Sequence, residues 1–116
     1  MQDVLESLTQ VSGVRGSLLV GRDGMIIASD LPQEISDDRV AAVTGAIAAT
    51  VQDSLAKLDR GPLMHAQIDA EDGKVFLQEA GRGLLVVLAQ REVNTGLIRL
   101  EMKAAVDELR RRLRAA

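Results

Sequence analysis

The spacing of hydrophobic residues changes several times along the chain, and each change predicts a different element. Helical spacing over residues 3–11 predicts a short first helix, with Asp3 as its N-terminal cap. Two apolar, partly β-branched runs follow, Val14–Val20 and Met25–Ser29. The Asp23-Gly24 pair between them tolerates the positive φ angles of a tight turn. The first part of the chain is therefore predicted to be a helix followed by a β-hairpin.

A long helix is predicted next, over about residues 38–58. Ser36 or Asp37 is expected to cap its start. Gly61-Pro62 is expected to end it, because glycine accepts a positive φ after a helix and proline cannot continue one. Turns at Asp72-Gly73 and Gly81-Arg82-Gly83 then separate three predicted strands, which cover residues 63–70, 74–80 and 84–90.

The last of these strands is apolar without alternation, which is typical of a central strand covered on both faces. A final helix is predicted from Asn94 or Thr95 onward, with a buried stripe of Ile98, Met102, Ala105, Val106, Leu109 and Leu113. The resulting α-β-β-α-β-β-β-α order belongs to the α/β class in its α+β form. It predicts a profilin-like, three-layer sandwich, in which a five-stranded antiparallel sheet has one helix on one face and two on the other. The 116 residues are expected to form a single domain, 1–116.

The predicted long helix carries two apolar faces. At about 100° per residue, one face holds large side chains able to cover the sheet: Val40, Val43, Ile47, Val51, Leu55 and Leu58. The other face holds small ones: Ala42, Gly45, Ala46, Ala49 and Ala56. Small apolar residues let a second helix approach closely, so this face is predicted to be a dimer contact. The alternative is that alanine, the best helix former, simply fills exposed positions.

The strand over residues 63–70 is predicted to lie at an edge of the sheet, and it has neither lysine nor internal proline to block pairing. Its alternation places Met64, Ala66, Ile68 and Ala70 on one face and Leu63, His65, Gln67 and Asp69 on the other. Two copies are predicted to join edge to edge in a two-fold dimer. The residues predicted for this interface are Ala42, Gly45, Ala46, Ala49, Met64, His65, Ala66, Gln67 and Ile68.

Residues with catalytic or metal-binding potential are sparse. His65 is the only histidine, which excludes a site of several histidines, and its place on an alternating strand favours a surface or interface role over catalysis. The acidic run 69–73 lacks calcium-loop spacing and is better explained as a turn, and no phosphate-binding P-loop motif occurs. No catalytic residue, metal ligand or cofactor is therefore predicted.

Composition narrows the possible environments and partners. The absence of cysteine excludes disulfides and thiolate sites. No apolar run approaches the roughly 20 residues of a membrane span, and the first residues lack the features of a signal peptide. A soluble, cytoplasmic protein without a membrane span is therefore expected. A net charge of −3 and a single aromatic residue, Phe76, argue against nucleic acid as a partner.

The one strong charge run consists of Arg110, Arg111, Arg112 and Arg114 at the end of the last predicted helix. Cations there complement the helix dipole, so a solvated helix face is the first interpretation. Contact with nucleic acid or with an acidic partner is the alternative.

With these elements in order, the sequence resembles the Roadblock family, the dynein-light-chain-related domains that include bacterial proteins of the MglB type. The resemblance covers nearly the whole chain. It is carried by Gly13-Val14-x-Gly16-x-Leu18-Leu19-Val20 and the following Asp23-Gly24-x-Ile26-Ile27-Ala28-Ser29, with an Ala-rich middle helix over Val40–Ala49. It implies a homodimer built through the middle helix and the next strand, and a Ras-like small GTPase as partner.

The leading hypothesis is therefore a non-enzymatic, homodimeric regulatory module that binds a Ras-like small GTPase, with stimulation of GTP hydrolysis as a further expectation. Arg15, Arg22, Arg39, Arg60 and Arg82 lie in or near turns and helix ends, but none is nominated as an arginine finger. The alternatives are a nucleotide-indifferent scaffold that joins signalling or motor components, and a small hydrolase that uses His65.

Overall fold

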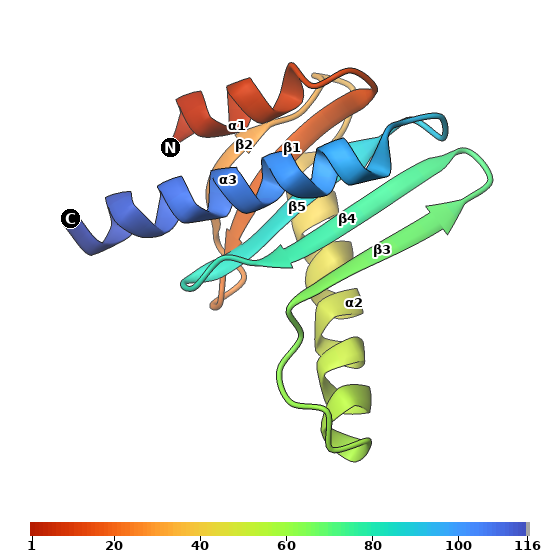
Figure 1. The fold of residues 1–116 in the computed structure, drawn as a ribbon, viewed down its shortest axis with the longest axis vertical. Coiled ribbons are helices and arrows are strands. Elements are labelled where there is room, and N and C mark those ends of the chain that lie inside the picture. Colours follow the sequence, from red (N-terminus) through yellow and green to blue (C-terminus); the bar gives the residue numbers. More distant parts are fainter. Residues whose placement is uncertain (116) are drawn as a thin grey trace.

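The computed structural model describes residues 1–115. Within them, three helices and five strands follow one another in the predicted order (Figure 1). Their bounds are α1 (Gln2–Thr9), β1 (Val14–Gly21), β2 (Ile26–Asp30), α2 (Asp37–Lys57), β3 (His65–Ala70), β4 (Gly73–Glu79), β5 (Gly83–Ala89) and α3 (Thr95–Ala115). Every predicted boundary of these elements lies within two residues of the observed one.

The five strands form one antiparallel sheet in the order β2-β1-β5-β4-β3. β5 is the central strand, paired with β1 on one side and with β4 on the other. Its residues Leu85, Val86 and Val87 are fully buried, which confirms that this apolar strand is covered on both faces. β2 and β3 are the outer strands, so the predicted edge position of the strand that follows α2 is confirmed.

Helices cover both faces of the sheet: α1 and α3 lie on one, and α2 crosses the other (Figure 1). Side chains of β5 alternate accordingly, with Leu85 and Val87 in the core cluster beneath α1 and α3 and Val86 in the cluster beneath α2. The first cluster also takes in most of the predicted α3 stripe, namely Ile98, Met102, Ala105, Val106 and Leu109. The predicted three-layer α+β sandwich is therefore confirmed.

Polar side chains set the helix starts largely as predicted. Ser36 Oγ accepts a hydrogen bond from Arg39 N (3.2 Å) at the start of α2, and Asn94 Oδ1 accepts one from a backbone N–H in the first turn of α3 (3.0 Å). Asp3 does not cap the first helix, because α1 begins earlier, with Met1 in the cap position. Asp3 lies instead inside the first turn, where its carboxylate faces the positive end of the helix dipole.

The hairpins close with short turns. Gly24 and Gly81 both adopt positive φ angles of 84° in the turns after β1 and β4, which favours glycine at these two positions. The turn after β3 lies one residue earlier than predicted. Ala70 pairs with Gly73, so the loop consists of residues 71 and 72.

The side of α2 that meets the sheet overlaps the predicted large-residue face only in part, since Val40 and Ile47 of that face pack against the cluster beneath α2. Its buried residues are the small Ala41 and Thr44, whereas Val43 is 54% exposed and Leu58, just past the helix end, is 65% exposed. The prediction that these two large residues cover the sheet is therefore wrong. Small side chains let the helix lie close to the strands, and the C-terminal half of α2 extends past β3, where no sheet lies beneath it (Figure 1).

Candidate functional site

The outer edge of β3 is open to another strand. Within residues 1–115, β3 pairs with β4 alone, from His65 opposite Gln78 to Ala70 opposite Gly73. An edge strand presents unpaired N–H and C=O groups that can template a further strand. Met64, the residue just before β3, is 68% exposed. This edge combines open hydrogen-bonding groups with exposed apolar surface, which makes it a candidate protein-binding site.

Within β3, the predicted alternation is confirmed by contacts on its two faces. The prediction is wrong for Leu63, which precedes the strand and is buried on the α2 side, where its N–H donates to Gln52 Oε1, and not on the face of His65. Ala66 packs against the cluster beneath α2, and Ile68, which shares its face, is half-buried. His65 points to the opposite face, where Arg99 Nη2 of α3 lies 2.6 Å from its Nε2. The residue that contacts His65 is therefore a guanidinium and not the hydroxyl or carboxylate that a hydrolytic triad needs.

Gln67 shares the face of His65 and is exposed. Its Nε2 donates to Asp69 Oδ1 (2.8 Å), and Lys74 Nζ lies 2.9 Å from the same oxygen. The hydrogen bond from Gln67, and after it that from Lys74, holds the pKa of the Asp69 carboxyl below its ordinary value. This end of β3 therefore carries polar side chains that stay in solvent.

The small-residue face of α2 lies along a hollow and not along β3. Gly45 and Ala49 line a hollow of about 470 Å³ together with the β1–β2 turn over residues 21–24. Ala42 and Ala46 are exposed, and the helical repeat turns them further from the sheet. Of the predicted α2 contacts, Ala42 and Ala46 are therefore free to meet a second helix, whereas Gly45 and Ala49 face the hollow.

Substituting Gly45 with alanine is expected to raise the free energy of unfolding by about 1 kcal/mol. Apart from the nearby backbone of its own helix, no atom of residues 1–115 lies within 4 Å of a Cβ built at this position, so the variant gains helix propensity without a clash. Urea unfolding at equal protein concentrations measures the change. A loss of stability would show that the glycine serves the fold. A gain in stability accompanied by weaker self-association would show that glycine is needed at this position because a second molecule packs against it.

A second flank of α2 carries larger apolar residues at one-turn spacing: Val43, Ile47 and Val51. Ile47 packs against the same cluster as Ala66 of β3, while Val43 stays exposed. This flank was missed as an interaction surface because its residues are equally suited to covering a sheet. The length of the helix could have revealed this exposed flank. The 21 residues of α2 span about 32 Å, whereas five strands span only about 20 Å, so part of the helix must extend beyond the sheet.

The described residues contain neither a group of metal ligands nor an unpaired buried polar side chain. Within residues 1–115, no three His, Cys, Asp or Glu side chains are grouped to hold a metal ion, and every buried side-chain nitrogen or oxygen has a hydrogen-bond partner. Ser17 Oγ, for example, donates to Leu5 O (3.0 Å), and Thr44 Oγ1 donates to Val40 O (2.6 Å). Across residues 1–115, no helix combines the length and the hydropathy that a membrane span requires.

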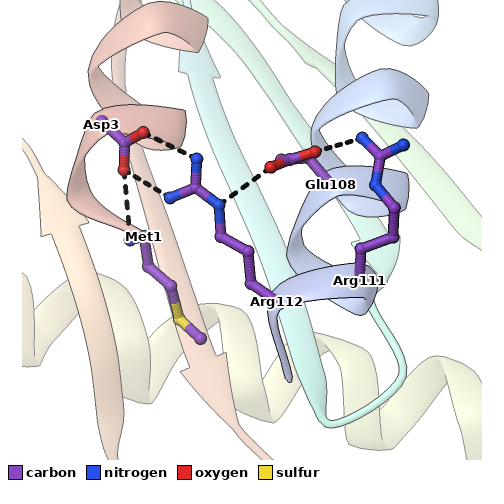
Figure 2. Close-up of polar contacts among 5 residues, drawn as sticks. All are labelled: Met1, Asp3, Glu108, Arg111 and Arg112. Atoms are coloured by element: carbon purple, nitrogen blue, oxygen red, sulfur yellow. Dashed lines mark hydrogen bonds and ion pairs between the residues drawn. The ribbon is translucent and has the colours of Figure 1, made fainter. Parts of the chain in front are cut away.

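An ion-pair network joins the start of α1 to the end of α3 (Figure 2). Arg112 donates through Nη1 and Nη2 to the two carboxylate oxygens of Asp3 (2.7 and 2.8 Å) and through Nε to Glu108 Oε1 (3.0 Å). The Met1 amino group lies 3.2 Å from Asp3 Oδ1, and Arg111 contacts Glu108. Hydrogen bonds from Arg112 hold the pKa values of the Asp3 and Glu108 carboxyls below their ordinary values.

This network is expected to make the free energy of unfolding fall slightly in acid. Because folding lowers both carboxyl pKa values, the stabilisation is present above their ordinary values of 3.8 and 4.5 and is lost as the pH falls through the lowered ones. The effect is small because these groups are exposed. Urea unfolding of the wild type and of Arg112→Gln at neutral pH and near pH 3 tests it. An equal pH dependence in the two proteins would contradict the assignment.

Known proteins share both the sequence pattern and the fold. Residues 1–89 match the Roadblock/LC7 domain family. The uncharacterized protein MJ0310 of Methanocaldococcus jannaschii is 39% identical over 107 residues, which cover 92% of this chain and 94% of that protein.

Solved structures with the same fold share a lower sequence identity with this chain. Myxococcus xanthus MglB superimposes with a TM-score of 0.92 at 23% identity, over 99% of this chain and 95% of the MglB chain. An MglB with a tetrameric arrangement superimposes with a TM-score of 0.85 at 26% identity, over 94% and 84% of the two chains. These superpositions extend beyond residue 89 into α3. The resemblance that the sequence motifs predict is therefore confirmed, and the chain belongs to the Roadblock/LC7 family.

Proposed function

We propose that this protein is a homodimeric regulatory or adaptor module that binds a Ras-like small GTPase. Membership in the Roadblock/LC7 family supports a regulatory or adaptor role over a catalytic one. The observation that carries the proposal is the open edge of β3 beside an exposed apolar flank of α2. Such a surface is typical of a chain that completes its sheet with a second molecule.

In the proposed dimer, two β3 edges pair antiparallel across a two-fold axis and form one continuous sheet. The two α2 helices then lie side by side on the same face, where Val43, Ala46 and Ile47 meet their symmetry mates. Ala66 and Ile68 of β3, together with Met64 just before the strand, contribute apolar contact on that face. His65 and Gln67 border the pairing on the other. The tetrameric arrangement of a similar MglB supports self-association of this fold.

The proposed action on the GTPase is conformational. A two-fold platform that binds one arrangement of the switch loops more tightly than the other shifts their equilibrium by the difference in binding free energy. Arg22 is unsuited to act as an arginine finger, because its guanidinium is held by Glu79 Oε1 (2.9 Å) and Gly81 O (2.9 Å). Any stimulation of hydrolysis is proposed to work in the same conformational way, through the GTPase's own catalytic groups.

Capture from source-cell extract on the immobilised protein tests this proposal, with a non-hydrolysable GTP analogue and GDP in parallel. A small GTPase retained at least tenfold better in one nucleotide state, a difference of about 1.4 kcal/mol, is the expected result. A monomeric variant on a second column serves as control and should lose the GTPase. Partners retained equally in both states would favour the scaffold, and retention of no GTPase would overturn the proposal.

A further inference from the structure

Three segments that lie far apart in the sequence meet at one end of the molecule. They are the β1–β2 turn, the β4–β5 turn and the C-terminal end of α3, all on the left of Figure 1. Arg82, Arg110, Leu113 and Arg114 line a shallow depression there. Arg82 and Leu113 also line the adjoining one, together with Met25 and Ile27. These six residues form one continuous area, called the arginine surface below.

The arginines of α3 fall into two groups by their partners. Arg111 and Arg112 are neutralised by Glu108 and Asp3. Arg110 and Arg114 lie one turn apart, and within residues 1–115 neither they nor Arg82 has a carboxylate within 4.0 Å. The helix dipole accounts for cations at the end of α3, but it does not account for Arg82, which lies on a turn.

The side-chain carboxylates of Glu79 and Asp23, which lie beside the arginine surface, accept hydrogen bonds from groups within the turns. Glu79 Oε1 accepts hydrogen bonds from Arg22 Nη2 and from the backbone N–H of Gly81 (both 2.9 Å). Asp23 Oδ1 accepts one from the backbone N–H of Met25 (3.0 Å). Arg22 thereby ties the β1–β2 turn to the β4–β5 turn. The two turns are held together while Arg82, Arg110 and Arg114 remain exposed to an outside partner.

Exposed apolar side chains lie beside these free guanidinium groups. Met25 is 68% exposed and Ile27 is 41% exposed. Leu113 belongs to the stripe predicted to be buried, yet it is only half-buried and faces the depression. Cations interspersed with exposed apolar side chains are typical of surfaces that rest on an anionic membrane.

We propose that the arginine surface binds a bilayer rich in anionic phospholipid. The guanidinium groups of Arg82, Arg110 and Arg114 pair with headgroup phosphates, which they match in a two-pronged geometry. Met25 and Ile27 enter the boundary between headgroups and acyl chains. A nucleic acid offers the same phosphates, but it offers no apolar layer for these side chains, and the surface has no aromatic residue to stack on bases. Because the net charge of the chain is −3, the chain as a whole is not attracted to an anionic bilayer, and the attraction is proposed to come from this cluster of unpaired arginines.

Vesicle co-sedimentation tests the proposal with phosphatidylcholine alone and with equal parts of phosphatidylcholine and phosphatidylglycerol. We expect binding to the mixed vesicles only, weakening as salt screens the charges. Each arginine near an anionic surface contributes about fivefold to the partition coefficient. The triple variant Arg82→Gln, Arg110→Gln, Arg114→Gln is therefore expected to bind about a hundredfold more weakly.

The matched control is Arg60→Gln, Arg91→Gln, Lys103→Gln, which makes the same charge change at exposed positions elsewhere and should bind like the wild type. Met25→Ser changes a side chain that is 68% exposed, so it is expected to fold normally and to weaken binding severalfold through loss of the apolar contact. Circular dichroism verifies folding of each variant. Absence of binding to mixed vesicles, equal losses in the two triple variants, or tighter binding to duplex DNA than to vesicles would each overturn the proposal.

Discussion

Replacing Val43 with glutamate is expected to leave the protein folded but monomeric. Val43 is 54% exposed within the chain, so a carboxylate there costs the isolated fold little. In the proposed dimer, each copy buries this position against the partner's α2, where an unpaired charge costs about 3–5 kcal/mol. The dissociation constant is therefore expected to rise by about a thousandfold or more. Sedimentation velocity over a range of concentrations measures it.

The small-residue flank of α2 offers a matched control for this substitution. Ala49→Glu adds the same charge to the same helix, at an exposed position beside the hollow, and should leave the dimer intact. Ala46→Glu, on the outward side, should dissociate it as Val43→Glu does. If Ala49→Glu separates the copies and Val43→Glu does not, the dimer contact lies on the side of Gly45 and Ala49. If neither changes the mass, α2 is not part of the contact.

Phe76→Ala is expected to lower the free energy of unfolding by about 3–5 kcal/mol. Phe76 is the single aromatic residue and is 2% exposed in the cluster beneath α1 and α3. Its removal leaves a cavity that the paired strands around it cannot close. Such a loss is a large part of the 5–15 kcal/mol that stabilises a typical domain. Urea unfolding at fixed protein concentration, with an unchanged slope against denaturant, is the measurement.

Two further variants separate packing from any general sensitivity of the fold. Phe76→Leu keeps most of the buried volume and should cost less than about 1.5 kcal/mol. Leu100→Ala changes a side chain that is exposed on α3 and should change the stability by no more than about 0.5 kcal/mol. A loss for Phe76→Ala that is no larger than that for Leu100→Ala would show that the cluster is not packed around Phe76.

Prediction from sequence succeeded where the controlling physics is local. The alternation of residues 65–70 identified both faces of β3, as the contacts of Ala66 and His65 confirm. The unbroken apolar run of residues 84–89 identified the central strand. Ser36 and Asn94 were identifiable as caps because a cap depends only on the next few backbone N–H groups.

The rotation of α2 about its axis was not predictable in the same way. The helix offers a large apolar flank and a small one, and either can face a sheet. The structure places the narrow strip that contains Ala41 and Thr44 against the strands, between the two flanks. That choice depends on how closely the helix can approach the sheet and how far it extends beyond β3, and both are properties of distant segments.

The sequence by itself determined the order of elements, the antiparallel hairpins, the edge position of β3 and the family, because periodicity, turn residues and motifs are encoded in neighbouring positions. The tertiary structure alone decided which flank of α2 stays exposed and which arginines remain unpaired. Arg112 is hydrogen-bonded to Asp3, which lies 109 positions away in the sequence. Arg82 and Arg110 line the same depression without a carboxylate partner among the described residues. Contacts between such distant residues depend on how whole helices and strands pack together, so they cannot be predicted from the pattern of neighbouring residues.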